Sequence, residues 1–265
     1  MNTKVTGQLE EIKAYYKQRA TVDHYATSPD RHLREIEIEY IGRRLADGLR
    51  VLDIGCGNGY STLCHAAKHN AHFVGGDFVP EMVQAAERLR DSFTLKGRVD
   101  FQVADVTHIE HPDASFDAVI SQRCLLNLPS RPAQWQAMSE IARVLKPGGR
   151  YLMLEGTLQG LRRLNQVRTQ FALDEIPEAD QKYNSFSNKF DEPEMLAKAN
   201  EYFTAFEGVQ RFGMYYLISR VIHPLLAAPA APRYDAPINE IARQLCSHFP
   251  NFEDMGHVAL FTFLK

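Results

Sequence analysis

The sequence predicts an α/β fold built on a mostly parallel sheet. Between residues 49 and 155, five short apolar runs alternate with segments of helical periodicity. Such alternation is typical of right-handed β-α-β units, in which helices cover both faces of a parallel sheet. A turn with three alternating glycines follows the first run. These two observations predict one doubly covered sheet with a ligand site where its first strand ends.

The first strand is expected at residues 49–54, where Val51, Leu52 and Ile54 form a run suited to burial on both faces. Gly55, Gly57 and Gly59 then alternate. Without a Cβ these positions permit a tight turn and let backbone amides approach a ligand, while the next helix directs its N-terminus to the same place. A small polar or anionic ligand is therefore expected there.

The remaining elements follow from periodicity and from helix-stop signals. Helices are expected at 9–19, 30–45, 60–69, from Pro80, at 135–145 before Lys146-Pro147-Gly148-Gly149, at 158–171, from Pro193, at 214–226 as a buried helix, and at 238–246. Strands are expected at 72–76, 99–103, 116–121, 151–155, near 203–212 and at 257–264. The arginines of the helix at 158–171, Arg162, Arg163 and Arg168, are expected in solvent.

Composition narrows the class of protein. A chain of 265 residues with 45% hydrophobic content can bury a sizeable core, and its net charge of −3 gives no reason to expect a nucleic acid or a membrane as partner. The four cysteines form no CxxC pair, so neither a disulfide framework nor a zinc knuckle is expected. No signal peptide or apolar run of membrane-spanning length occurs, which predicts a cytoplasmic protein.

The glycine turn separates two cofactor classes. A dinucleotide site requires Gly-x-Gly-x-x-Gly, but Tyr60 stands at the last position. The segment Asp53-x-Gly-x-Gly-x-Gly instead resembles motif I of the class I S-adenosylmethionine (SAM) dependent methyltransferases. Val-Leu-Lys-Pro-Gly-Gly-Arg-Tyr-Leu-Met, which ends at Met153, resembles the family's motif before and into the fifth strand. An NAD-dependent oxidoreductase is thereby the weaker alternative.

The resemblance implies which residues bind the cofactor. Asp77 lies 22 positions after Gly55, a spacing at which a carboxylate reaches ribose hydroxyls, and in the family this acid holds both of them. Asp105, after the third strand, would accept from the adenine amino group. The cofactor-binding residues expected from the core are Asp53, Gly55, Cys56, Gly57, Asp77, Phe78, Asp105, Val106, Ser121 and Gln122. Tyr16, Arg19 and Tyr25 are added from an N-terminal segment that resembles the family's lid, although ordinary packing or solvent-facing roles are the alternative for each.

The resemblance also implies how the parts of the chain outside residues 49–155 are arranged. It implies a seven-stranded sheet whose last strand runs antiparallel to the others, with an N-terminal lid and helical cap inserts. One domain is expected over 1–265, divided into a lid at 1–45, a SAM-binding core at 46–156, acceptor-side inserts at 157–250 and a closing strand at 251–265. A homodimer is left open.

The implied function is methyl transfer from SAM to a small organic acceptor, such as a sugar or secondary metabolite, with oxygen preferred over nitrogen. The alternatives are a small-amine N-methyltransferase and a non-catalytic SAM-binding protein. The acidic pI and the absence of an Asn-Pro-Pro-Tyr type motif argue against a nucleic-acid substrate. Oxygen acceptors need a base to remove the proton, and the candidates are Glu155, Tyr183 and His223.

No metal is expected. His65 and His69 stand four apart on a predicted helix, but Ala66 replaces the glutamate of the zinc-protease pattern. His108 and His111, with acids nearby, are interpreted as a solvated loop.

Overall fold

A computed structural model describes residues 3–20, 28–178, 187–249 and 252–265. Its centre is a seven-stranded sheet in the order β3-β2-β1-β4-β5-β7-β6. The strands are β1 (Arg50–Ile54), β2 (His72–Asp77), β3 (Arg98–Val103), β4 (Phe116–Gln122), β5 (Leu145–Gly156), β6 (Ala205–Arg211) and β7 (Val258–Leu264). β7 pairs antiparallel with both β5 and β6, whereas the pairings among β1 to β5 are parallel. The predicted fold class is confirmed.

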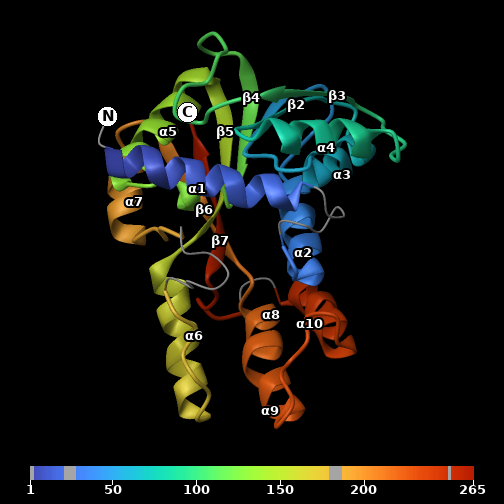
Figure 1. The fold of residues 1–265 in the computed structure, drawn as a ribbon, viewed down its shortest axis with the longest axis vertical. Helices are drawn as coiled ribbons and strands as arrows, with labels where there is room; N and C mark the ends of the chain where they lie inside the picture. The colour runs from blue at the N-terminus through green and yellow to red at the C-terminus, as the bar shows by residue number, and fades with distance from the viewer. Residues whose placement is uncertain (1–2, 21–27, 179–186, 250–251) are drawn as a thin grey trace.

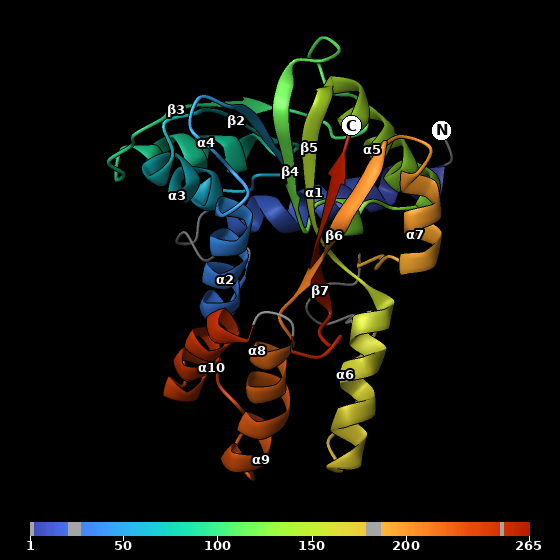
Figure 2. The same ribbon diagram turned by 180° about the vertical axis from the view of Figure 1, so that it is seen from behind.

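Helices cover both faces of the sheet, and further helices extend from its carboxyl edge (Figures 1 and 2). They are α1 (Thr3–Arg19), α2 (Arg31–Gly42), α3 (Tyr60–Lys68), α4 (Pro80–Arg90), α5 (Arg131–Val144), α6 (Leu158–Gln170), α7 (Glu192–Ala199), α8 (Gly213–Leu217), α9 (His223–Ala227) and α10 (Pro237–His248), with a short 3-10 turn η1 (Leu125–Asn127) and a π-helical turn η2 (Ile218–Ile222).

Two cores form because successive strand residues point to opposite faces. Val51 and Ile120 join one cluster with side chains of α2, α3 and α8, while Leu52 and Val119 join the other with side chains of α5 and α7. All four strand residues are almost completely buried. Packed side chains therefore cover both faces of the sheet, and this packing fixes the positions of the strand ends at its carboxyl edge.

Two predicted elements differ from the structure. β5 begins at Leu145, so Lys146–Gly149 lies within an irregular strand, where the Gly148 N–H donates to the Lys265 carbonyl and the Lys265 N–H donates to Gly149. The expected buried helix at 214–226 is interrupted by η2 and ends in solvent, where Leu226 is 71% exposed.

The first helix lies across the carboxyl edge of the sheet (Figure 1). On α1, Ile12 is buried, and the Lys17 ammonium pairs with the Glu81 carboxylate of α4 at 2.7 Å. Apolar contact and this ion pair hold the helix over the ends of the strands. Of the helices in the described ranges, none combines the length and the apolar character needed to span a bilayer.

Candidate functional site

A cavity of about 940 Å³ opens at the carboxyl edge of the sheet. Its walls come from α1, the ends of β1 to β4, the C-terminal part of α6 and the segment from η2 to α9. The expected site residues that line it are Tyr16, Arg19, Asp53, Gly55, Cys56, Gly57, Asp77, Phe78, Asp105, Val106, Gln122 and His223. Residues far apart in the sequence are thus brought to one site, as expected for ligands beyond the ends of parallel strands.

The glycine turn is fixed by backbone hydrogen bonds to the neighbouring strand. The Gly55 and Cys56 N–H groups both donate to the Gly76 carbonyl, at 2.7 and 3.0 Å. Gly55 has φ +76°, and a Cβ at this position would lie 2.4 Å from Cys124 Sγ. Only glycine satisfies both conditions, so the loop after β4 can pack directly against the turn.

Asp77 connects β2 to this turn. One carboxylate oxygen accepts from the Gly57 N–H at 2.8 Å, and the other accepts from the Val79 N–H at 2.9 Å. Burial raises the pKa of Asp77, while these two backbone donors oppose the increase. Each oxygen keeps a second lone pair, so the carboxylate can still accept hydroxyl groups from a ligand in the cavity.

Asp53 and Asp105 complete the acidic groups at this end. Thr62 Oγ1 donates to the Asp53 carboxylate at 2.6 Å, and burial raises the pKa of Asp53 to about 6. Asp105 is exposed, accepts from the N–H and hydroxyl of Thr107, and lies beside buried Val106. Three acids therefore lie at the ends of β1, β2 and β3.

Side chains of α1 close the cavity over this acidic end. Lys13 Nζ lies 5.0 Å from the centre of the Phe78 ring, and Arg19 stacks over Tyr15 at 4.5 Å. Tyr16 lines the cavity, and burial raises its pKa well above the ordinary value. The expected lid tyrosine Tyr25 lies outside the described residues.

Beyond β4, the chain enters a buried polar network. Gln122 Nε2 and Arg123 Nη2 both donate to Glu37 Oε2 of α2, at 2.8 and 2.9 Å. Arg123 adopts φ +53°, a left-handed conformation that costs energy for a residue with a side chain. Glu37 is completely buried, and the guanidinium of Arg34, also buried, adds a second positive charge beside it. This network was not foreseen from the sequence.

Two expected site residues do not line the cavity. Glu155 is completely buried, and its carboxylate accepts from the backbone N–H groups of Cys124, Leu125 and Leu126 at 2.9 to 3.1 Å. Ser121 is buried too and bonds to Tyr151 Oη and Glu155. The expectation that Glu155 faces the acceptor is wrong, because its lone pairs hold the loop after β4. Ser121 likewise serves that packing.

Of the other two candidate bases, His223 lines the cavity from the start of α9 and is 7% exposed. Tyr183 lies outside the described residues. His257 was missed: it also lines the cavity, immediately before β7. Because β7 is antiparallel and Val258 pairs with Gly156, the start of β7 lies at the carboxyl edge of β5. The predicted direction of the closing strand could have identified it.

Of the three arginines of α6, two are exposed to solvent and one lines the cavity. Arg162 and Arg163 form exposed ion pairs with Glu178 and Glu253, as expected. Arg168 instead lines the cavity, and the expectation that it faces solvent is wrong. Its position near the C-terminal end of the helix turns it toward η2, where Arg168 Nη1 donates to the Arg220 carbonyl.

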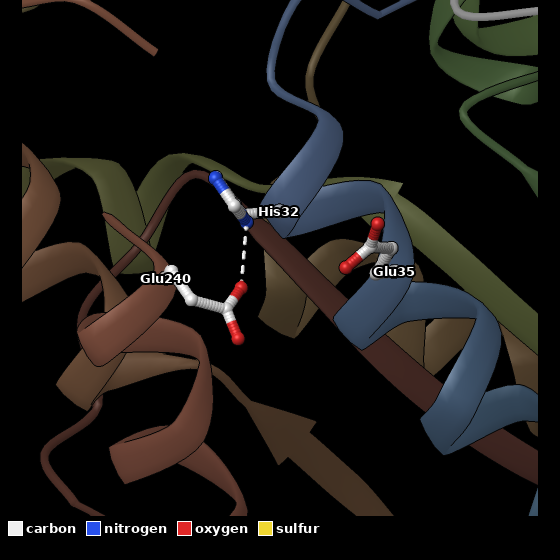
Figure 3. A group of neighbouring side chains, drawn as sticks. All are labelled: His32, Glu35 and Glu240. Carbon is white, nitrogen blue, oxygen red and sulfur yellow. Dashed lines mark ion pairs between the residues drawn. The ribbon is translucent and has the colours of Figure 1, made fainter. Parts of the chain in front are cut away.

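Within the described ranges, one group of three residues has the composition of a metal site: His32, Glu35 and Glu240, whose ligand atoms lie within 4.8 Å of one another (Figure 3). Arg243 donates to both carboxylate oxygens of Glu240, at 2.9 and 2.6 Å, and lies 3.4 Å from Glu35. A guanidinium already compensates these charges, and none of the three residues lines the cavity. We interpret it as a contact between α2 and α10.

Known proteins share parts of this sequence and its fold. A family model described as a methyltransferase domain matches residues 51–149. Methyltransferase GfsG of Streptomyces halstedii is 30% identical over 146 residues, which cover 55% of this chain and 50% of that protein. O-methyltransferase rstn1 of Aspergillus nomiae is 31% identical over 158 residues, covering 57% of this chain and 67% of that protein. Both O- and N-methyltransferases are among the relatives.

The chain therefore spans half to two thirds of the length of these two relatives. Among solved structures, the putative methyltransferase complexed with the Haloferax volcanii Trm112 activator superimposes with a TM-score of 0.63 at 18% identity, covering 94% of this chain and 96% of that one. This likeness concerns the fold. The methyltransferase-domain match and the identity to rstn1, together with the seven-stranded sheet, show that the chain belongs to the class I SAM-dependent methyltransferases.

Proposed function

We propose that this chain transfers the methyl group of SAM to a small organic acceptor, at oxygen. The observation that carries the proposal is Asp77, whose carboxylate lines the cavity while it fixes the glycine turn after β1. A carboxylate beside exposed backbone of a glycine turn suits a ribose and the charged tail attached to it.

The residues fit the cofactor as follows. Asp77 would accept from the two ribose hydroxyls, and Asp105, with Val106 and Phe78 beside it, would hold the adenine. Gly55, Cys56 and Gly57 leave room for the amino-acid tail because two of these three positions lack a side chain. Tyr16 and Arg19 would cover the ligand from α1. Bound SAM supplies a methyl group on a sulfonium, an electrophile that is already activated.

The protein must then hold the acceptor in line, exclude water and remove a proton from a hydroxyl acceptor. The inserts at 157–250 would form the acceptor side, with the lid at 1–45, the cofactor core at 46–156 and the closing strand at 251–265. His223, from α9, is the proposed base, because it lines the same cavity as the residues at the strand ends. An imidazole nitrogen is a suitable acceptor for the proton of a hydroxyl group.

Calorimetry with SAM, its demethylated product S-adenosylhomocysteine (SAH) and NAD tests the cofactor. We expect micromolar binding of SAM and SAH, no binding of NAD, and at least a tenfold loss of affinity in Asp77→Ala. Release of SAH in the presence of a small-molecule extract tests the reaction, with His223→Gln expected to retain SAH binding and lose turnover. Binding without turnover on any extract would favour a non-catalytic SAM-binding protein.

A further inference from the structure

The cavity lining outside the ends of β1, β2 and β3 is rich in positive charge. It includes Arg123, Arg168, Lys189, Arg220 and Arg233, with Arg19 and Arg34 from α1 and α2, and one acid, Asp30. The other lining acids of the described chain lie at the ends of β1, β2 and β3, where the cofactor is proposed to bind. Most of the lining cations therefore come from segments other than the strand ends that carry these acids.

Three of these cations are matched by carboxylates. Arg220, whose side chain is 12% exposed, pairs with Asp30, which also accepts from Tyr215 Oη at 2.5 Å. Arg123 pairs with Glu37 at 2.9 Å. Arg233 pairs with Asp235 at 2.6 Å, in solvent. These pairs account for much of the positive charge, and Lys189 donates to the Glu178 carbonyl and to the Ser187 hydroxyl. Arg168 is bound differently from the three paired arginines.

Arg168 is held by neutral acceptors. Its Nε donates to the Asp174 carbonyl at 2.8 Å, and Nη1 donates to the Arg220 carbonyl. In the described ranges no ion pair joins its guanidinium to a carboxylate, although the charge of Asp174 acts on it from nearby. Burial and the adjacent Arg220 charge lower the pKa of Arg168. Its geometry is set by carbonyl groups, which orient the guanidinium without cancelling its charge.

His257 also lines the cavity, near the charges of Arg220, Lys189 and Arg123. Its Nδ1 is buried and forms no hydrogen bond with the described residues. Burial lowers the pKa of His257 well below its ordinary value, and the charges of Arg220, Lys189 and Arg123 lower it further. The imidazole is therefore neutral. A negative charge placed among these cations would offset them and supply a partner for the ring.

We propose that the acceptor is a small organic anion, bearing a carboxylate or a phosphate, and that Arg168, which lines the cavity, binds this anionic group. The inference rests on the proposed function, since it assigns the acceptor of that same reaction. Charge attraction is stronger for a partly buried guanidinium than for one in open solvent, and a guanidinium matches the geometry of either oxyanion. The methylated atom would be a separate nucleophile on the same molecule.

Binding of simple anions to the SAH-saturated protein tests this inference directly. Inorganic phosphate and acetate serve as probes, with chloride at equal ionic strength as the reference, and thermal shift and calorimetry as readouts. We expect at least one of the two oxyanions to bind the wild type, and its affinity to fall about tenfold in Arg168→Gln, the loss typical of one hydrogen bond to a charged group.

Arg163→Gln is the matched control, because Arg163 lies on the same helix but forms an exposed pair with Glu253 outside the cavity. Equal anion affinities in the two variants, or no oxyanion binding to the wild type, would overturn the proposal. Phosphate and acetate distinguish the two kinds of anionic group. SAH affinity, measured in the same proteins, should remain within twofold of the wild-type value.

Turnover supplies the second readout. Hydroxylated organic acids and phosphate monoesters are compared with their neutral methyl esters or alcohols by SAH release, and we expect kcat/KM to be at least tenfold higher for the anions. A preference for neutral acceptors would contradict the inference while leaving methyl transfer intact. If SAM itself does not bind to any of the proteins, the proposed function fails instead.

Discussion

The carboxylate of Asp77 accepts a 2.8 Å hydrogen bond from the backbone N–H of Gly57, so the end of β2 determines the shape of the turn after β1. Gly57 has φ +58°, in the left-handed region that favours glycine. The other oxygen of the same carboxylate accepts from Val79 at the start of α4. One side chain thus organises two loops that border the cavity and remains available to a ligand.

Asp77→Asn tests this double role. An amide can accept through only one of its two terminal atoms, so one backbone N–H loses its partner. We expect the free energy of unfolding to fall by about 1 to 2 kcal/mol and SAH affinity to fall more than tenfold, measured by denaturation and calorimetry. Asp100→Asn is the control, since Asp100 pairs with His72 and Arg98 at the sheet surface. Unchanged SAH affinity in Asp77→Asn would contradict the assigned role.

Gly55→Ala separates backbone strain from steric overlap. The substitution places a methyl group 2.4 Å from Cys124 Sγ at a residue with φ +76°. Gly148 has nearly the same φ, +77°, but a Cβ added there would meet nothing within 4 Å. We expect Gly148→Ala to cost about 1 kcal/mol from the left-handed backbone alone, and Gly55→Ala to cost a further 1 to 3 kcal/mol or so from overpacking. If chemical denaturation gave equal losses of unfolding free energy for the two variants, the loop after β4 would have moved to accommodate the added methyl group at little cost.

The sheet and its cofactor end were predictable because local patterns specify them. Alternating apolar residues such as Val51 and Leu52 supply two opposite core faces, and the glycines and Asp77 lie at fixed distances from the strand they follow. These features depend on short-range geometry, so a single sequence contains them.

The acceptor end was less predictable because it depends on contacts between distant segments. Arg220 meets Asp30 across 190 positions, and Glu37 meets Arg123 across 86. The hydrophobic periodicity of a sequence does not predict such long-range pairs. An arginine on a helix is most often in solvent, as Arg163 is. Glu155 was misjudged for a related reason: its place at a strand end was correct, but the direction of its carboxylate follows from the path of η1.

The Glu37 network gives a third prediction. Burial raises the pKa of Glu37, while the adjacent Arg123 charge, the hydrogen bond from Gln122 and the Arg34 charge favour the carboxylate. We expect the two arginine charges to outweigh burial, so that Glu37 is a carboxylate in the folded protein. Glu37→Gln should then lower the free energy of unfolding by about 3 kcal/mol, because two guanidinium groups lose their counter-charge in the interior. Urea denaturation measures the change.

Glu39→Gln is its control on the same helix, where Glu39 forms a surface pair with Arg43. An exposed pair of this kind contributes about 0.5 kcal/mol or less. A loss in Glu37→Gln as small as that in Glu39→Gln would mean that Glu37 is protonated in the folded protein and that burial outweighs both arginines.

Glu155 makes the stability of the protein depend on pH. Burial raises its pKa from 4.5 to about 7, against the hydrogen bonds from Leu125, Leu126, Cys124 and Ser121. The folded state therefore holds this proton more tightly than the unfolded state. The resulting stabilisation is complete below pH 4.5 and is lost as the pH rises through 7, a change of about 3 kcal/mol.

Glu155→Gln removes this titration, so the quantity to measure is the difference in unfolding free energy between the wild type and the variant, from pH 4.5 to pH 8. We expect the advantage of the wild type to shrink by about 3 kcal/mol over this interval. Glu10→Gln, the same substitution on the exposed side of α1, is the control variant. A difference for Glu155→Gln that does not change with pH would mean that the three backbone N–H groups stabilise the carboxylate enough to cancel its burial, since hydrogen bonds to the charged form lower a carboxyl pKa.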